Sequence, residues 1–295
     1  MIPDSLPVLP DPEPELFRER LLSIMDRKDH PSYWRLMGPG ATRRQLLTHY
    51  RQEWAVYVRD FPIFLARVHS RCPVPEIRHE LAENLYEEET GRISGGGPHA
   101  ELFLRMMEGL GFERRLFEQV RLRPRSRAYR EYLDHATLRS PWIVGLAVAT
   151  IFVEGSRNDR AEIASAPMPE PVPRSKTNDR SGGVATSGPS AEASLEESID
   201  RLVESCQPVG MRRPIHDTDP LTSDPLVVHH GLDPRYLELK RVHRKVEGGH
   251  RVSAWSGVLA HARTSVERMH VTHGLERALE LWLDYRDGVS EAARL

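Results

Sequence analysis

Hydrophobic residues recur at intervals of three and four positions along most of this 295-residue chain, which is the spacing of one face of an α-helix. The first such stretch covers residues 14–28, with apolar side chains at Leu16, Phe17, Leu21, Ile24 and Met25. No stretch combines alternating apolar and polar residues with the turn residues that predict a β-hairpin. The pattern therefore predicts an all-α protein.

Proline and glycine divide the remaining apolar pattern into further helices. Proline suits the first turn of a helix, and glycine commonly ends one. On these signals we predict helices over residues 42–60, 62–71, 75–90, 98–109, 141–155, 234–250 and 252–290. Residues 141–153 are apolar on every side, which predicts a helix buried in the core. This run is also too short to cross a bilayer.

Residues 156–231 interrupt the helical pattern. Most of this segment is rich in proline, serine, glycine and charged residues, a composition typical of disordered chain. A capping box that starts at Ser194 predicts one short helix ending near Cys206. The predicted organisation is a flexible N-terminus, one helical metal-binding domain in two parts, and a largely disordered insertion between those parts: residues 1–12, 13–155 with 232–290, and 156–231.

Composition excludes several classes of protein. The formal net charge of −2 gives no electrostatic reason to expect nucleic acid or an anionic membrane as a partner. Two cysteines, Cys72 and Cys206, are too few for a disulfide framework or a cysteine-type zinc site. The first residues carry neither the basic nor the apolar region of a signal peptide. We therefore expect a cytoplasmic protein that binds neither nucleic acid nor membrane.

Three residues near the C-terminus carry the strongest chemical signal. His243, Glu247 and His250 are spaced i, i+4 and i+7, so a helix places them on one stripe. Two imidazoles and one carboxylate form half of a metal site. This nitrogen and oxygen donor set suits a transition metal such as iron or zinc better than calcium or magnesium.

Three upstream residues complete the predicted site. Glu89 ends one helix and His99 begins the next, and the glycine-rich turn between them lets both side chains point into the same space. Glu154 ends the apolar helix, where a buried carboxylate needs a cation or hydrogen bonds. Together with the C-terminal stripe, these residues form a set of three carboxylates and three imidazoles that can hold two Fe(II) ions. We predict that these six side chains are the metal ligands and the catalytic residues.

At this point the sequence resembles a known family, the haem-oxygenase-like di-iron oxidases, whose fold is shared with thiaminase II and pyrroloquinoline-quinone synthase. The resemblance covers about residues 15–155 and 230–290. It rests on an ordered series of motifs: Asn84-Leu85 leading to Glu89-Thr90-Gly91, His99 in HAELF, Glu154, and the stripe His243, Glu247 and His250. It implies a haem-oxygenase-like bundle of about seven helices.

The chain departs from the pattern of this family at two points. Glu247 stands where the family usually has Asp, so the carboxylate reaches one methylene further. Gly248 and Gly249 lie inside the ligand helix, where each glycine costs about 1 kcal/mol relative to alanine. A weakly held second iron is therefore one expectation.

The resemblance implies an O₂-dependent, non-haem di-iron oxidase or oxygenase. Its substrate is expected to be a small organic molecule from specialised metabolism: an amino acid, an amine, a fatty acid or an aromatic precursor. The expected partners are this substrate and O₂, with a homodimer as one possible assembly. In one alternative, the chain is a metal-independent oxidase resembling pyrroloquinoline-quinone synthase. In another, it is a non-catalytic helical interaction module.

A rival metal site remains open at the sequence level. Glu247 with His250, and Glu267 with His270, are both Glu-x-x-His pairs of the kind found in ferritin-like di-iron bundles. Both pairs lie close together at the C-terminus, however, and their order differs from the order in such bundles. We therefore prefer the six-residue site.

Overall fold

The structure is a computed structural model that describes residues 14–169 and 221–295. The side chains of four residues inside a helix also lie outside the described part: Val246, Glu247, Gly248 and His250. Predictions for the N-terminal residues 1–12 and for the short helix near 194–206 likewise lie outside the described residues. The described residues all belong to one structural unit. The domain boundaries themselves stay predictions.

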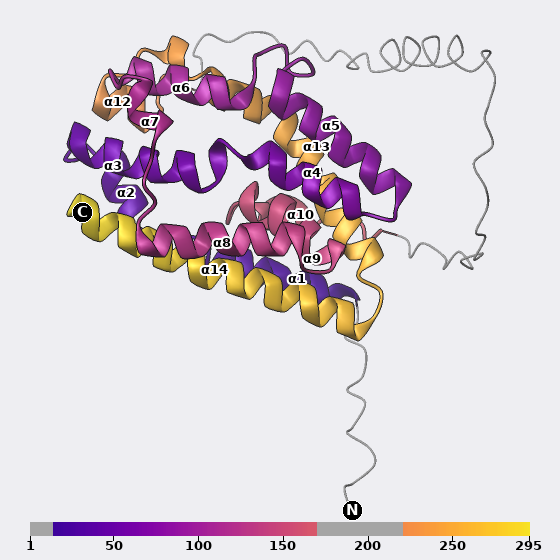
Figure 1. Cartoon of the computed structure of the whole chain (residues 1–295). Coiled ribbons are helices and arrows are strands. Elements are labelled where there is room, and N and C mark those ends of the chain that lie inside the picture. Colours follow the sequence, from indigo (N-terminus) through magenta and orange to yellow (C-terminus); the bar gives the residue numbers. More distant parts are fainter. Residues whose placement is uncertain (1–13, 170–220) are drawn as a thin grey trace, which may run out of the picture. The chain divides into compact units, whose positions relative to one another are not determined.

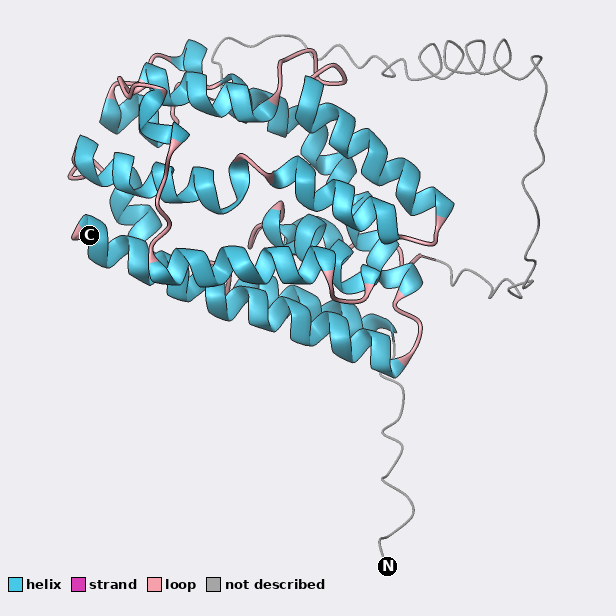
Figure 2. Cartoon of the chain, viewed as in Figure 1, coloured by secondary structure: helices cyan, strands magenta, loops and turns pink. Residues whose placement is uncertain are grey.

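The described part of the chain consists of helices and turns, with no strand in it (Figure 2), and the all-α prediction is confirmed. The longer helices are α1 (Pro14–Asp26), α3 (Arg43–Glu53), α4 (Phe61–Arg71), α5 (Pro75–Thr90), α6 (His99–Gly109), α8 (Pro124–Leu138), α13 (Glu238–His261) and α14 (Ser265–Ala293). The shorter ones are α2 (Pro31–Met37), α7 (Arg115–Glu118), α9 (Trp142–Leu146), α10 (Asp159–Ile163), α12 (Pro225–His230) and the 3₁₀ turn η3 (Pro234–Tyr236).

Two segments wind as π-helix instead of α-helix. The first, η1 (Trp54–Val58), continues α3, and the second, η2 (Ala147–Val153), continues α9. A π-helical turn holds one residue more than an α-helical turn, so it changes the direction in which the following side chains point. The helices predicted over 42–60 and 141–155 are thus present, but the C-terminal half of each is wider than an α-helix. Such segments are frequent at functional sites.

The buried helix predicted from its apolar sequence lies in the core. Ala147, Val148, Ile151 and Phe152 of η2 are fully enclosed. The neighbours of η2 are α4, α8, α13 and α14, and α8 runs side by side with α14 (Figure 1). Burial of one such large apolar side chain contributes roughly 1.5–3 kcal/mol to the free energy of unfolding. Packing on all sides fixes the end of η2, where Glu154 stands.

A second apolar cluster positions η1 against α6. The Trp54 ring stacks on Phe103 at a centroid distance of 5.5 Å and meets Phe117 edge-on at 6.3 Å. The indole N–H of Trp54 donates a hydrogen bond to the Phe117 carbonyl at 2.9 Å, so this buried polar group is satisfied. The cluster therefore holds η1 beside the helix that begins at His99.

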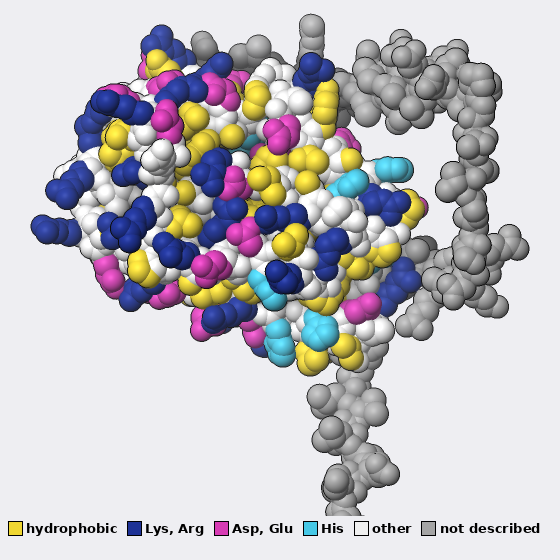
Figure 3. Space-filling view, in the orientation of Figure 1, with side chains coloured by type: hydrophobic (Ala, Val, Ile, Leu, Met, Phe, Trp, Pro, Cys, Tyr) yellow, Lys and Arg dark blue, Asp and Glu magenta, His cyan; other side chains and the backbone are white. Residues whose placement is uncertain are grey.

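Both described ends of the predicted insertion carry a helix. α10 contacts α1 and α13, and α12 contacts α2. On the visible face of the molecule, Asp and Glu side chains are scattered among Lys and Arg side chains (Figure 3). None of the described helices is both long enough and apolar enough to cross a membrane.

Candidate metal centre

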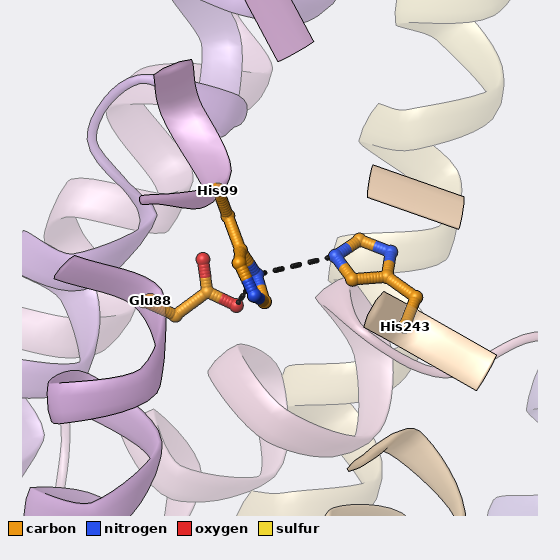
Figure 4. Close-up of side chains that lie close together, drawn as sticks. All are labelled: Glu88, His99 and His243. Atoms are coloured by element: carbon orange, nitrogen blue, oxygen red, sulfur yellow. Dashed lines mark hydrogen bonds and ion pairs between the residues drawn. The ribbon is translucent and has the colours of Figure 1, made fainter. Parts of the chain in front are cut away.

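Three side chains from three helices converge at one point (Figure 4). Glu88 comes from the end of α5, His99 from the start of α6 and His243 from α13. Oε1 of Glu88 lies 2.8 Å from Nδ1 of His99, and Nδ1 of His99 lies 3.3 Å from Nε2 of His243. One ligand atom from each residue lies within 4.8 Å of the other two. Two imidazoles and one carboxylate are a donor set that suits iron.

The turn between α5 and α6 explains how Glu88 and His99 meet. Gly91 ends α5 with a left-handed φ of 63°, which non-glycine residues rarely adopt. A Cβ on Gly91 would lie 2.3 Å from the carbonyl oxygen of Gly97, so the backbone at the two ends of this turn approaches too closely for a side chain. The chain thereby reverses sharply, and the first residue of α6 faces the last turn of α5.

A buried carboxylate supports this turn from behind. Oε2 of Glu87, a residue that is 0% exposed, accepts hydrogen bonds from the backbone N–H groups of Ile93 at 2.8 Å and Ser94 at 3.2 Å. Its other oxygen lies 3.3 Å from Nε2 of His99. Burial opposes the ionisation of Glu87, but the hydrogen bonds from Ser94, Ile93 and His99 outweigh it and lower the pKa of this carboxyl. Glu87 therefore stays ionised.

The two nitrogens of His99 thus have different surroundings. Nε2 faces the carboxylate of Glu87, and Nδ1 faces Glu88 and His243. With the Nε2 proton kept on the side of Glu87, loss of the Nδ1 proton would free the lone pair of Nδ1 for a metal ion. Burial would lower the pKa of His99, but the carboxylates of Glu88 and Glu87 raise it above its usual value. A metal ion at Nδ1 would take the place of a proton there.

The structure places Glu88, and not Glu89, against His99. Glu89 is exposed. One residue along an α-helix rotates the side chain by about 100°, so neighbours in the Glu87-Glu88-Glu89 run cannot all face inward. The buried residues Ile77, Leu81 and Asn84 form a stripe on α5, and at helical spacing this stripe continues to Glu87 and Glu88. That register is the signal in the sequence that identifies the inward-facing carboxylates.

The other predicted ligands are placed as follows. His99 is 4% exposed, and it lines one cavity together with His243 and Glu154. Oε1 of Glu154 accepts a hydrogen bond of 2.8 Å from the side-chain amide of Asn84. The structure therefore brings His99, His243 and Glu154 to the same cavity. Glu247 and His250 belong to α13, but their side chains lie outside the described residues, so their assignment as ligands stays a prediction.

This cavity has a volume of about 200 Å³ and a mostly apolar wall. The two π-helical segments supply much of the wall: η1 contributes Tyr57 and Val58, and η2 contributes Thr150 and Val153. The Tyr57 hydroxyl donates a hydrogen bond to Glu53, and burial raises the pKa of this phenol well above its usual value. The candidate metal ligands, apolar groups and a protonated tyrosine therefore line the same cavity.

Arg251 brings a positive charge to the same wall. Its guanidinium lies 2.9 Å from a Glu162 oxygen and 3.4 Å from Asp159, which is fully buried. Both acids belong to α10, inside the segment predicted as an insertion. The described start of that segment therefore contributes to the surroundings of the cavity.

In the rival pair Glu267 and His270, the carboxylate of Glu267 caps a helix. Glu267 forms a capping box with Thr264 at the start of α14, where its carboxylate accepts backbone hydrogen bonds of 2.9 Å from Arg263 and Thr264. His270 is exposed three residues further along. Glu267 thus acts as an N-terminal cap of a 29-residue helix.

Comparison with known proteins agrees with this donor set. Residues 48–173 match the model of a family described as "Iron-containing redox enzyme". The resemblance to haem-oxygenase-like iron enzymes is confirmed. The matched segment contains Glu88, His99 and Glu154, and it ends before His243.

Two curated relatives carry the name 4-aminobenzoate synthase. The one from Chlamydia muridarum (strain MoPn / Nigg) is 31% identical over 98 residues, which is 32% of this chain and 39% of the relative. The one from Chlamydia pneumoniae is 28% identical over 79 residues, which is 27% of this chain and 34% of the relative. The chain thus matches less than half the length of either relative. The relatives are named as synthases and the matching family is one of redox enzymes, and both similarities therefore point to an enzyme.

Proposed function

We propose that this protein is a non-haem iron oxidase or oxygenase that uses O₂ to oxidise a small organic molecule. The observation that carries the proposal is the convergence of Glu88, His99 and His243, whose ligand atoms lie within 4.8 Å of one another beside a mostly apolar cavity. The match to a family of iron-containing redox enzymes supports iron as the metal.

The proposal includes two Fe(II) ions. Glu88, His99 and His243 would hold the first, and Glu154 would take part in holding the second together with Glu247 and His250. Iron bound in this way supplies the binding and reduction of O₂. The number of ions and the identity of the second set of ligands rest on the sequence pattern.

The remaining side chains of the site prepare it for this chemistry. Glu87 holds the imidazole of His99 in one orientation, and the amide of Asn84 does the same for the carboxylate of Glu154. Val58, Phe61, Val153 and Leu239 cover the cavity with apolar surface, which limits the access of water to a reactive centre. Tyr57 keeps its proton at the cavity wall through the hydrogen bond to Glu53.

Among the substrate classes that the sequence leaves open, we propose an aromatic precursor. Both curated relatives carry the name of an aromatic product. A wall that combines Tyr57, Phe61 and several aliphatic side chains also suits a flat apolar ring.

The test is reconstitution without oxygen. Purified protein is loaded with Fe(II), the bound iron is measured, and O₂ is then admitted while visible absorption and O₂ consumption are recorded. The proposal expects about two irons per chain. It also expects a transient absorption band whose lifetime becomes shorter when a suitable aromatic substrate is present. Substrate-dependent O₂ uptake without iron would instead support a metal-independent oxidase. Absence of both signals would support a non-catalytic interaction module.

A further inference from the structure

A second cavity lies next to the metal cavity, because Tyr57 and Gly155 line both. Its volume is about 350 Å³. Aromatic rings and cationic side chains dominate its wall. The rings include Tyr33, Trp34 and Trp282, and the cations include Lys28 and Arg286. Nothing in the chemistry described so far uses these residues.

Arg286 on α14 is a buried cation, 4% exposed. Its guanidinium stacks near the rings of Trp282 at 5.3 Å and Tyr33 at 5.6 Å, and NH1 lies 3.3 Å from Nδ1 of His49. The buried Nε has no hydrogen-bond partner, and within the described part of the chain no carboxylate lies within 4.0 Å of this guanidinium. A buried charge without a paired anion is costly.

Lys28 brings a second cation to the same cavity. Its ammonium donates hydrogen bonds to the carbonyl oxygens of Phe152, Val153 and Gly155, at the end of η2. This contact leaves the positive charge without a carboxylate within 4.0 Å among the described residues. The ammonium also lies over the Phe152 ring at 4.9 Å and over Trp282 at 5.9 Å.

The two acids of the cavity wall are engaged elsewhere. Glu53 accepts the hydrogen bond from Tyr57 and lies 3.2 Å from Nε2 of His49. Asp29 pairs with Arg157 at 2.8 Å and accepts a hydrogen bond from the Trp34 indole at 2.9 Å. Lys28 and Arg286 therefore share one wall in which no carboxylate is placed directly against either of them.

We propose that this cavity binds an aromatic organic acid, with its carboxylate paired to Arg286 and Lys28 and its ring against Trp34, Tyr33 and Trp282. A guanidinium presents donors in a planar fork that fits a carboxylate. The bound acid would add a direct anionic partner to two cations on which Glu53 and Asp159 act only without contact. Because Tyr57 and Gly155 line both cavities, an acid bound here would lie next to the metal cavity. The role of this cavity as the anchor of the substrate rests on the proposed function, but the binding of an aromatic acid in the cavity does not.

The test uses metal-free full-length protein, so that it does not depend on iron. Isothermal titration calorimetry is carried out with phenylacetate and 3-phenylpropionate, and with the corresponding neutral amides, which keep the shape and remove the charge. We expect at least one acid to bind, and its amide to bind at least about tenfold more weakly, the loss expected when a charged hydrogen-bonded pair is removed. Failure of both acids to bind at millimolar concentration, or equal affinity of acid and amide, overturns the proposal.

Two variants locate the site. Arg286→Gln and Lys28→Met should each weaken binding of the acid at least about tenfold, whereas Arg125→Gln should leave it unchanged. Arg125 is a matched control because it also contacts α14, through Asp284 and Glu291, but lies outside the cavity. Circular dichroism verifies the fold, and if Arg286→Gln does not fold, Lys28→Met decides. A folded variant that binds the acid as tightly as the wild type overturns the site. Iron content, measured separately, shows whether the metal centre fails independently.

Discussion

Nε2 of His99 lies 3.3 Å from Oε1 of the fully buried Glu87, whereas Nδ1 of the same ring faces Glu88 and His243. Nε2 of the imidazole is therefore held by a carboxylate with no access to solvent, and Nδ1 is directed at the other candidate ligands. Carboxylates that hold a metal-ligating histidine in this way raise its basicity and fix its orientation.

Glu87→Gln should consequently weaken iron binding by about 10–100-fold, the range typical when such a supporting carboxylate is removed. The amide keeps the size of the side chain but loses the charge that orients His99. Competition with a chelator measures the affinity for Fe(II), and circular dichroism verifies that the variant is folded. Unchanged affinity in a folded variant would show that Glu87 only supports the turn at Ile93 and Ser94.

The adjacent pair Glu88 and Glu89 offers a matched comparison. Glu88→Ala removes a carboxylate that lies 2.8 Å from His99, so we expect most bound iron to be lost. Glu89→Ala changes an exposed residue one position further along the same helix, so iron content should stay at the wild-type level. Metal analysis after reconstitution without oxygen distinguishes the two. The reverse result would mean that α5 presents the other carboxylate to the metal.

Gly249 is exposed within α13, and a Cβ built there meets nothing within 4 Å. Gly249→Ala should therefore stabilise the protein by about 1 kcal/mol, because alanine restricts the unfolded chain and favours the helix. Gly91→Ala is the control with the opposite sign, since its φ is 63° and its Cβ would meet the backbone of Gly97. Thermal unfolding of both variants tests the prediction, which a lower unfolding temperature for Gly249→Ala would contradict.

Burial lowers the pKa of Lys28 from its usual 10.5 to about 8. The unfolded chain thus holds this proton more tightly than the folded protein, so the contribution of Lys28 to stability rises with pH between these two values and is constant below them. Relative to Lys28→Met, the wild type should gain stability as the pH rises from about 7 to about 9.5. Urea unfolding of both proteins across this range measures the difference, and a difference that is constant or falls would refute the assignment.

The sequence predicts the fold class and the approximate helices because apolar spacing and Pro/Gly signals are local properties. It also predicts His99, His243 and Glu154 as neighbours, and the structure brings all three to one cavity. The sequence pattern predicts Glu89 instead of Glu88, because three successive glutamates contain no local signal that tells which side chain faces inward. The register set by Ile77, Leu81 and Asn84 resolves that choice once the helix is known to be buried on that side.

Other features depend on contacts that no local pattern contains. The π-helical turns at Trp54–Val58 and Ala147–Val153 leave no mark in the apolar spacing, and Tyr57 and Val153 within them line the cavity. The approach of Lys28 to the end of η2 joins residues more than a hundred positions apart, so the second cavity could not be predicted from spacing. The shape and lining of both cavities therefore depend on tertiary contacts, which the spacing of residues in the sequence does not contain.

The central claim is that His243 binds iron together with Glu88 and His99, and iron content in a folded His243→Ala variant tests it most directly. Both proteins are reconstituted with Fe(II) without oxygen, and helical circular dichroism is recorded on the same samples. We predict that the wild type retains iron and that His243→Ala loses most of it with its helical signal unchanged. A variant that keeps the full iron content of the wild type would contradict the assignment.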